Sequence, residues 1–522
     1  MRKVSAISAR ASNPPDLCEN CVMTSLLLGI DIGTTATKAV LVTPAGHVVS
    51  EGRAQYATDH LAATWVEQNP DEWWRTLCDA TREAIAKVPD VKILGVAISS
   101  QAPTFLAVDK EGKPLRPALI WMDRRAEAQA QELASKFPNI SDLTGNRADP
   151  YYVAAKILWF IRNEPKLYAN TKYFLQIPGY LNFKLTGQFG IDKPHASLLQ
   201  LRTADQSGWS NELIAAIGVD PELFPEIAEC SKLQGEVNSQ ASIESGIPEG
   251  TPVFFGSVDG ASAALEAGAI DPGVVAEMTG TSTVLIMPTD GTVRNNAFVA
   301  MSHAIPGREL QLGAMVASGA SVQWLHEKIL GKHESIEKLI SGAEKVNPGS
   351  EGVLFLPYMM GERSPIWNTN ARGVFFGLSL TTSPEAMARA VLEGTAFALL
   401  HNIEIARASG ISVDEIRSVG GGTKNALWNQ IKADVLGIPV AILKESVGAP
   451  IGNAFIAGLG LGLYPDIRSA VTSAVSIADR YQPNSKHHEY YQDRYQRFRS
   501  LYVNLKDEFD QSAKSAVYGG GA

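Results

Sequence analysis

Apolar and polar positions alternate in blocks that predict a strand, a turn and a second strand near the start of the chain. The run LLLGIDI, residues 26–32, has the length and composition of a buried strand. The polar Gly-Thr-Thr that follows predicts a tight turn, and KAVLVT, residues 38–43, predicts a strand that returns beside the first. This segment is therefore predicted to form a β-hairpin.

A helix and a further strand are predicted next. PDEWWRTLCDATREAIAKV, residues 70–88, begins near residues that can cap a helix, Asn69 or Asp71. The apolar residues that fall near one face of this helix are Trp74, Leu77, Cys78 and Ile85. ILGVAIS, residues 93–99, has the pattern of a buried strand. Strands that alternate with helices indicate an α/β architecture.

The opening pattern returns about halfway along the chain. VVAEMTGTSTVLIM, residues 274–287, places a Gly-Thr-Ser turn between two apolar strands, as the first hairpin does. Two α/β domains that each open with such a hairpin would face each other across a cleft, with a natural boundary at residues 270–273. Similar Gly-Thr turns also arise by chance, so the repeat alone leaves this interpretation open.

Length and composition exclude several classes of protein. The 522 residues correspond to three or four domains of about 150 residues, or to two large ones. A charged fraction of 19% argues against disorder, and four cysteines argue against a disulfide scaffold. A net charge of -9 argues against a nucleic-acid binder. No apolar run reaches the roughly 20 residues of a membrane span, so no span is predicted. We expect a protein in the cytoplasm whose partners are small molecules.

The first 22 residues differ from the rest because they are basic, rich in Ser and Ala, and free of acids before Asp16. One interpretation is a targeting segment, which would place the protein in an organelle. The other is a disordered arm or an upstream start, with Met23 beginning the folded protein. Cys18 and Cys21 form a single C-x-x-C with no second pair, so no zinc site is predicted.

The turn of the first hairpin carries groups suited to a polyphosphate. A glycine frees backbone amides, threonine hydroxyls and an ammonium can donate to phosphate oxygens, and an adjacent carboxylate can hold Mg²⁺. The residues concerned are Asp31, Gly33, Thr34, Thr35 and Lys38. An ordinary hairpin turn is the alternative.

The turn of the second hairpin, Thr279-Gly280-Thr281-Ser282, supplies a second set of phosphate donors. The chain contains no G-x-x-x-x-G-K-[ST] motif, so a Walker-type loop is excluded as the phosphate site. A phosphate chain would therefore be held between the two domains.

Asp259 is the candidate catalytic base. It stands where the apolar strand FFGSV ends, directly ahead of a helix rich in small residues. Side chains at the carboxyl ends of parallel strands line the cleft in which ligands of α/β proteins bind. Phosphoryl transfer needs a positioned base there to accept the proton of the substrate hydroxyl. The alternative is that Asp259 caps the helix that follows.

A third glycine-rich turn, residues 419–425, precedes the helical segment ALWNQIKADVLG. Three glycines let a flat ring or a phosphate approach the backbone closely, and the start of a helix favours negative charge. A generic glycine turn is the alternative. Near the C-terminus, helical spacing predicts a packed face made of Tyr491, Tyr495, Phe498 and Tyr502.

Taken together, these stretches resemble the FGGY carbohydrate kinases, a family of the actin, Hsp70 and hexokinase ATPase superfamily, from about residue 25 to residue 506. DIGTTATK resembles the first phosphate motif of that family and MTGTSTVL the second. SVDGASAALEAGAIDPG resembles the stretch with the catalytic aspartate, and GGGTKNALWNQIKADVLGIPV resembles the adenosine motif. The most specific match is PYMMGERSPIWNTNARGVFFGL, together with the long helix EAMARAVLEGTAFALLHNIE after it.

The resemblance implies two ribonuclease H-like domains that face a central cleft. Residues 24–272 would form the sugar-binding domain and residues 273–506 the nucleotide-binding domain, between an extension over residues 1–23 and a flexible tail over residues 507–522. Asp259 would deprotonate the sugar hydroxyl, and Asp31 would help to place Mg²⁺. The residues implied for ATP are Thr34, Thr35, Lys38, Gly280, Thr281, Gly319, Gln323, Gly421, Gly422 and Asn425. Arg363 and Arg372 of the signature segment are taken as structural.

The sugar site departs from the pattern of the family. Xylulokinases usually show Gly-Gln-Met-His here, whereas this chain keeps Gln101 but has Ala102 and Pro103 in place of Met and His. The remaining candidates for sugar binding are Trp121, Asp123 and Arg124, with Asp259. Because such hydrogen-bonding differences change substrate discrimination strongly, the family resemblance does not fix the sugar.

The leading hypothesis is an ATP-dependent sugar kinase that requires Mg²⁺ and acts on a ketopentose such as D-xylulose. Ribulose, gluconate or another polyol are alternatives as substrate, and the analogy with the family extends to a homodimer. Two other classes are a nucleotide-switched protein of the actin or Hsp70 kind and a catalytically silent sugar sensor. No nucleic-acid or membrane partner is expected.

Overall fold

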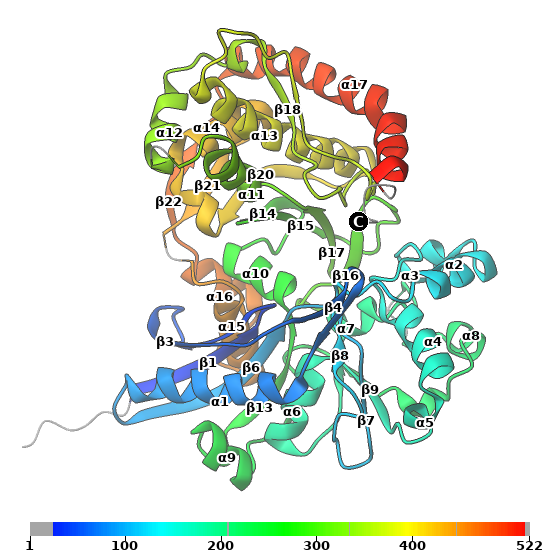
Figure 1. Ribbon diagram of the computed structural model, residues 1–522. Helices are drawn as coiled ribbons and strands as arrows, with labels where there is room; N and C mark the ends of the chain where they lie inside the picture. The colour runs from blue at the N-terminus through cyan, green and yellow to red at the C-terminus, as the bar shows by residue number, and fades with distance from the viewer. Residues whose placement is uncertain (1–23, 206–207, 333–334, 445, 517–522) are drawn as a thin grey trace, which may run out of the picture.

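Two α/β lobes, one above the other in Figure 1, face each other in the computed structural model of the protein, which describes residues 24–205, 208–332, 335–444 and 446–516. The expected extension over residues 1–23, with Cys18 and Cys21, lies outside these residues. Within the described ranges, no helix is both long and apolar enough to cross a bilayer.

The N-terminal lobe is built on a six-stranded sheet with the strand order β12-β13-β6-β1-β2-β3. β1 and β2 form the predicted antiparallel hairpin, and β6 and β13 continue the sheet on the other side of β1 as parallel strands. The strands are β1 (Thr24–Ile32), β2 (Ala36–Val42), β3 (Val48–Gln55), β6 (Val91–Ser100), β12 (Leu233–Glu236) and β13 (Pro252–Val258).

Helix α1 (Pro70–Ala86) packs on β2 and β3 of this sheet. Asn69 rather than Asp71 caps the helix, because its side chain accepts the Asp71 amide at 3.0 Å. Trp73 and Leu77 are fully buried against the sheet, as the apolar spacing of the segment requires.

Short strands and helices extend the N-terminal lobe toward the right of Figure 1. Aromatic contacts among Phe105, Phe160 and Phe174, two of them tilted and one edge-to-face, form the centre of a separate core. The strands are β4 (Asp59–Ala62), β5 (Trp65–Gln68), β7 (Leu106–Val108), β8 (Ala118–Leu119), β9 (Tyr173–Leu175), β10 (Ile191–Asp192) and β11 (Ile227–Ala228). The helices of this extension are α2 (Glu127–Lys136), α3 (Ile140–Thr144), α4 (Val153–Asn163), α5 (Pro165–Tyr168), α7 (Lys193–Leu198), α8 (Asn211–Ala216) and η1 (Pro221–Leu223). The helices α6 (Ile177–Thr186) and α9 (Ser239–Ser245) pack below the main sheet instead, α6 on β6 and β13 and α9 on α1.

The C-terminal lobe repeats the same plan on a seven-stranded sheet with the order β16-β17-β15-β14-β20-β21-β22. β14 and β15 form the second antiparallel hairpin, and β20 lies parallel to β14 just as β6 lies parallel to β1. The sequence repeat is therefore confirmed as a structural repeat. The strands are β14 (Gly273–Thr279), β15 (Thr283–Thr289), β16 (Val299–Ser302), β17 (Glu309–Met315), β20 (Val413–Val419), β21 (Val440–Leu443) and β22 (Ile477–Tyr481), with β18 (Leu354–Leu356) and β19 (Val374–Phe376) forming a separate ribbon.

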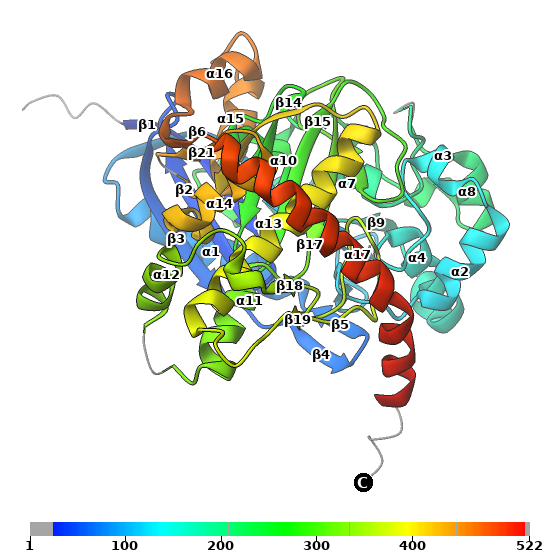
Figure 2. The ribbon, with the colours of Figure 1, turned by 90° about the horizontal axis from the view of Figure 1, so that it is seen from above.

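The long helices α13 and α17 cross the C-terminal lobe, as the view from above in Figure 2 shows. Tyr491, Tyr495 and Phe498 of α17 have no exposed surface, which confirms the predicted packed face. The tail expected from residue 507 is helical through Ala516, because Phe509 is buried in the same core. The helices are α11 (Gly319–Trp324), η2 (Leu325–Ile329), α12 (Ile336–Glu344), η3 (Ser350–Gly352), α13 (Pro384–Ala408), η4 (Gly421–Lys424), α14 (Ala426–Leu436), α16 (Ile467–Ala474) and α17 (Ser485–Ala516).

Helices α10 (Asp259–Ala267) and α15 (Ala449–Gly460) pack together between the two sheets. α15 also packs on β1 and β6, although it comes late in the sequence. A Cβ atom on Gly29 would lie 1.8 Å from the Pro450 carbonyl oxygen, so glycine permits this close approach. A boundary at residue 272 in sequence therefore does not separate the lobes in space, since α15 returns to the first sheet.

Candidate active site

Two carboxylates stand at the carboxyl ends of parallel strands in the N-terminal lobe. Asp31 lies near the end of β1, and Asp259 directly follows β13 as the first residue of α10. The Ser99 hydroxyl donates to Asp31 Oδ1 at 2.6 Å, and the Gly260 amide donates to Asp259 Oδ1 at 2.7 Å. Val258 occupies the N-cap position of α10, and its side chain makes no capping bond. The alternative of Asp259 as the helix cap is therefore wrong.

Burial raises the pKa of both carboxyl groups, and the negative charge of Asp31 adds to the rise for Asp259. The pKa of Asp259 rises from 3.8 to about 7, mainly because burial disfavours the charged form and also because Asp31 is negative. The pKa of Asp31 rises to about 6 through burial, against the opposing hydrogen bond from Ser99 and the positive charge of Lys38. A carboxylate with a pKa near neutral is well matched to the work of a general base.

Two residues of the predicted sugar site, Gln101 and Trp121, are bonded to the first hairpin, which carries Asp31. The Trp121 indole N–H donates to Thr34 Oγ1 at 3.3 Å, which ties the two segments together. Gln101 is only 2% exposed; its Nε2 donates to Gln68, whereas its Oε1 has no partner among the described residues. A buried acceptor without a donor is costly unless a ligand supplies one, which a sugar hydroxyl can do.

Tyr151 is a further residue of this site that the sequence did not single out. Its hydroxyl donates to the carbonyl oxygen of Ala102 at 3.0 Å. Burial raises its pKa, and the charges of Arg363 and Asp259 also act on it. Tyr151 thus brings a hydroxyl group beside the position where the sequence lacks a histidine. Nothing in the local sequence distinguishes this tyrosine from its buried neighbour Tyr152.

Asp123 and Arg124, both expected to bind the sugar, contact other side chains of the protein in this structure. Asp123 is fully buried; its carboxylate accepts the Val66 amide at 2.7 Å and pairs with Arg125 at 2.8 Å. Arg124 instead lies 3.2 Å from Asp149. Because the carboxylate of Asp123 is committed to partners inside the lobe, it supports the cleft wall in this structure rather than facing a ligand.

The turn of the first hairpin, expected to bind phosphate, is fixed by a bond to its backbone. The carbonyl oxygen of Thr34 accepts from Gln68 Nε2 at 2.8 Å, and Thr35 at the tip is exposed. The ammonium of Lys38 donates to the Val447 carbonyl at 2.8 Å and lies 3.4 Å from Glu51. In this structure Lys38 therefore joins β2 to the segment that precedes α15.

A cavity of about 840 Å³ in the C-terminal lobe brings together most of the residues expected to bind ATP. Two backbone contacts shape it: the Gly319 amide donates to the Gly280 carbonyl at 3.1 Å, and the Gly420 turn packs on Thr279. A Cβ atom on Gly319 would lie 2.3 Å from the Gly280 carbonyl oxygen, so only glycine fits. The expected residues that line the cavity are Gly280, Thr281, Gly319, Gln323, Gly421, Gly422 and Asn425.

The cavity also has walls that the sequence analysis missed. Ile336 and Ile340 of α12 and Leu427 of α14 supply apolar surface, and Lys424 supplies a positive charge. Ile336 and Ile340 are four residues apart on one helix, so their spacing was a usable signal for an apolar face. Apolar walls beside a glycine-rich turn suit a flat base and a phosphate chain.

A buried ion pair supports the turns of this cavity from behind. Lys432 Nζ lies 2.6 Å from Glu277 Oε1, and both side chains are at most 2% exposed. The Thr279 hydroxyl also donates to Glu277 Oε1 at 2.6 Å, and the Ser418 hydroxyl donates to the other oxygen. This network fixes the end of β14, from which the turn of the second hairpin extends.

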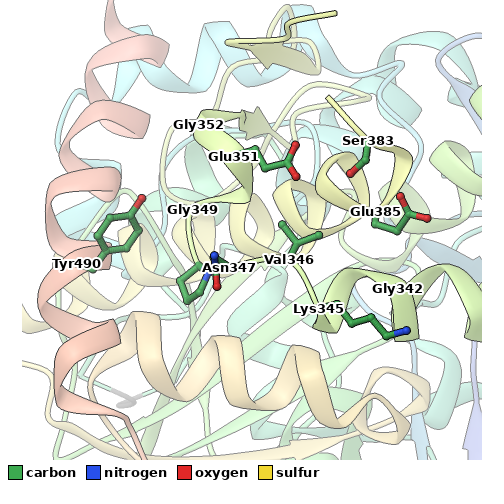
Figure 3. A pocket seen from close by; sticks show the side chains of 11 residues that line it. Gly342, Lys345, Val346, Asn347, Gly349, Glu351, Gly352, Ser383, Glu385 and Tyr490 are labelled. Carbon is green, nitrogen blue, oxygen red and sulfur yellow. The ribbon is translucent and has the colours of Figure 1, made fainter. Parts of the chain in front are cut away.

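A second cavity of about 520 Å³ lies on the other side of α12, between α13 and α17 (Figure 3). Its wall contains Lys345, Glu351, Glu385 and Tyr490, and none of the residues predicted for ATP or sugar. The side chain of Glu351 points toward Ser383 in Figure 3. This cavity is therefore separate from the nucleotide cavity, with α12 as the wall between the two.

Comparisons with known proteins agree with this geometry. The FGGY family of carbohydrate kinases matches with its N-terminal domain over residues 26–266 and with its C-terminal domain over residues 275–461. The xylulose kinase of Bacillus subtilis is 29% identical over 486 residues, which cover 92% of this chain and 97% of the relative. The gluconokinase of Bacillus licheniformis is 28% identical and covers 94% of this chain and 98% of the relative.

Solved structures of similar proteins have the same fold. The crystal structure of xylulose kinase from Rhodospirillum rubrum superposes with a TM-score of 0.87 at 28% identity, over 93% of this chain and 100% of that one. The gluconate kinase from Lactobacillus acidophilus gives 0.88 at 25% identity, over 93% and 99%. Both proteins are similar to this chain throughout the two lobes.

Proposed function

We propose that this chain, which belongs to the FGGY family of carbohydrate kinases, transfers the γ-phosphate of ATP to a hydroxyl of a ketopentose, D-xylulose. Its enzyme class, a phosphotransferase with a sugar hydroxyl as acceptor, follows from the family. The choice of D-xylulose is supported by xylulose kinases of several bacteria, which are 26–29% identical over more than nine-tenths of the chain.

The observation that carries the proposal is the position of Asp259, a carboxylate at the carboxyl end of β13 whose pKa burial raises to about 7, in a chain whose other lobe holds a cavity of about 840 Å³ lined by glycine turns. Asp259 accepts the proton of the attacking hydroxyl while the sugar oxygen forms its bond to the γ-phosphorus. The bond from the γ-phosphorus to the β,γ-bridging oxygen breaks, and ADP leaves. The proton ends on Asp259 and the phosphoryl group on the sugar, so no covalent enzyme intermediate is required.

The residues present fit a Mg²⁺ ion that arrives with ATP. Asp31 and Asp259 repel each other, and a cation near them would offset that repulsion. No cluster of three or more metal-ligating side chains occurs among the described residues, which suits an ion held by one or two carboxylates and the phosphates. Asp31 would hold it, and Mg²⁺ would neutralise charge on the phosphates during transfer.

The two phosphate turns are proposed to hold ATP between the lobes. Gly280 and Thr281 would donate to the phosphates from the C-terminal lobe, and Thr34 and Thr35 from the N-terminal lobe. Adenosine would occupy the cavity, whose remaining proposed contacts are Gly319, Gln323, Gly421, Gly422 and Asn425. Lys38 is not assigned to phosphate, because its ammonium is bound to the Val447 carbonyl.

D-Gluconate is the second candidate substrate. The sequence Ala102-Pro103 lacks the histidine usual in xylulokinases, and a gluconokinase is as similar to this chain as the xylulose kinases are. Gln101 and Tyr151 can bind hydroxyls of either sugar, and Trp121 can pack against the carbon chain. The residues do not exclude a polyol with a carboxylate at one end.

ADP release from MgATP, measured over a panel of sugars, tests the proposal. The panel contains D-xylulose, D-ribulose, D-gluconate and glycerol, each compared with a reaction without sugar. We expect the largest kcat/KM with D-xylulose and a phosphate ester of that sugar as the product. A larger kcat/KM with gluconate would replace the substrate, and hydrolysis that no sugar stimulates would refute the kinase.

A further inference from the structure

The segment Glu362–Trp367, inside the most specific motif of the sequence, reaches from the C-terminal lobe to the sugar wall of the N-terminal lobe. The guanidinium carbon of Arg363 lies 5.5 Å from the ring centroid of Trp121. Four residues later, Trp367 receives Arg147 of the N-terminal lobe over its ring at 3.9 Å. Each lobe thus places one arginine against a tryptophan ring of the other lobe.

Arg363 and Arg372, the two arginines of this motif, have different surroundings. The guanidinium of Arg372 donates to the carbonyl oxygens of Thr369 and Ala371 in its own loop, at 2.9 and 2.8 Å. The guanidinium of Arg363, by contrast, has no ion-pair or hydrogen-bond partner in the described part of the chain. A half-buried guanidinium with five free donors is suited to bind oxygen atoms of a ligand.

The charge of Arg363 reaches the sugar site. Burial raises the pKa of Tyr151, the positive charge of Arg363 lowers it, and the negative charge of Asp259 raises it. Tyr151 therefore lies within electrostatic range of both groups. Since Arg363 also covers Trp121, its donors border the space between these aromatic side chains and the catalytic carboxylate.

Glu362 links the backbone of Arg363 to the segment that leads into α11. Its Oε1 accepts the amides of Val316 and Arg363, each at 2.8 Å, and the residue is 4% exposed. Val316 follows β17 and leads into α11, whose first residue Gly319 lines the nucleotide cavity. One dipeptide therefore connects the sugar wall with the start of the nucleotide-binding helix.

We propose that Arg363 is a sugar-positioning residue supplied by the nucleotide-binding lobe. It donates to a sugar oxygen above Trp121 and, through Glu362, couples sugar binding to ATP binding. This role rests on the proposed sugar kinase activity and deepens it, because it gives the C-terminal lobe a direct contact with the acceptor sugar. It also explains why the two arginines of one motif need not have the same function.

The test compares Arg363→Gln and Arg363→Lys with Arg372→Gln as the matched control, using the sugar that the wild type turns over fastest. We expect Arg363→Gln to raise the KM for sugar by about 10- to 100-fold, the usual effect of losing a charged hydrogen bond. Arg363→Lys keeps the charge but not the planar fork, so it should lie between the wild type and Arg363→Gln. Arg372→Gln should leave the sugar KM unchanged.

A second readout separates this role from a loss of folding. The affinity for ATP is measured by calorimetry with and without sugar, on variants whose melting temperature matches the wild type. In the wild type, sugar should tighten ATP binding by about fivefold or more, and Arg363→Gln should abolish that coupling while ATP affinity without sugar is retained. Arg363→Lys serves as the folded variant if Arg363→Gln is unstable.

Each outcome decides between the two proposals. A wild type that phosphorylates no sugar refutes the kinase and this inference with it. An active wild type together with an Arg363→Gln variant of unchanged sugar KM and unchanged coupling refutes only the role of Arg363. A loss of ATP affinity measured without sugar would also overturn it, because it would indicate general damage to the nucleotide-binding lobe.

Discussion

Replacing Asp259 by asparagine should make the protein more stable and nearly inactive. The wild-type carboxyl group has its pKa raised from 3.8 to about 7 by burial and by the charge of Asp31. A shift of about three units corresponds to about 4 kcal/mol of unfavourable interaction for the charged form. Asparagine has nearly the same shape and no charge, so the variant avoids this cost.

The pH dependence of the effect follows from the direction of the shift. Because the pKa is raised in the folded state, the stability contributed by the protonated Asp259 is fully present below the unfolded pKa. This contribution to stability is lost as the pH rises from about 4, the pKa of Asp259 in the unfolded chain, through about 7, its pKa in the folded protein. The stability advantage of Asp259→Asn should therefore be near zero at acid pH and reach its maximum, at most about 4 kcal/mol, above neutral pH.

The assay is thermal unfolding of wild type and variant, without ligands, from pH 5 to pH 8. The melting temperature of Asp259→Asn should exceed that of the wild type by a few degrees at pH 8 and by much less at pH 5. Loss of the base should lower kcat by about 100- to 10,000-fold while ATP affinity is kept. A stability difference that does not change with pH, or a variant with normal turnover, would refute the reasoning.

Three further predictions concern the same site. The kcat/KM for the sugar should rise with pH and level off above about 7 as Asp259 ionises, and a flat profile across pH 6–8 would count against this base. Gly319→Ala should weaken ATP binding by about tenfold or more in calorimetry, because its methyl group would press on the Gly280 carbonyl, whereas sugar affinity should not change. Lys432→Met should lower the free energy of unfolding by about 3–5 kcal/mol by leaving Glu277 buried and unpaired, and adding Glu277→Gln should recover much of the loss in denaturant titrations.

The sequence by itself determined the local features of the protein. The two hairpins, the α/β alternation and the glycine turns could be predicted because each depends on the order of residues within a short segment. The position of Asp259 after an apolar strand was enough to place it at the mouth of a parallel sheet. The glycine turns at Gly280 and at Gly421 and Gly422 could be found in the same way, since glycine has few substitutes where a backbone must approach closely, whereas Gly319 and Gln323 were implied only by the family resemblance.

The tertiary structure decided which partner each polar side chain has. Asp123 stands beside Arg124 in sequence, yet its carboxylate is bound by Arg125 and the Val66 amide. Lys38 lies in the first phosphate motif, yet its ammonium is held by Val447, which is more than 400 residues away in the chain. Spacing along one strand or turn does not contain this information, because the competing acceptor comes from another element.

The tertiary structure also decided how the two lobes meet. Helix α15 follows most of the C-terminal lobe in sequence but packs on β1. The close approach is possible because Gly29 has no side chain. Arg363 and Arg372 are equivalent in sequence terms, and only the arrangement of the lobes places one over Trp121 and leaves the other on its own loop. The physical reason is that burial and charge act through space, so the chemistry of a group depends on neighbours that chain order does not specify.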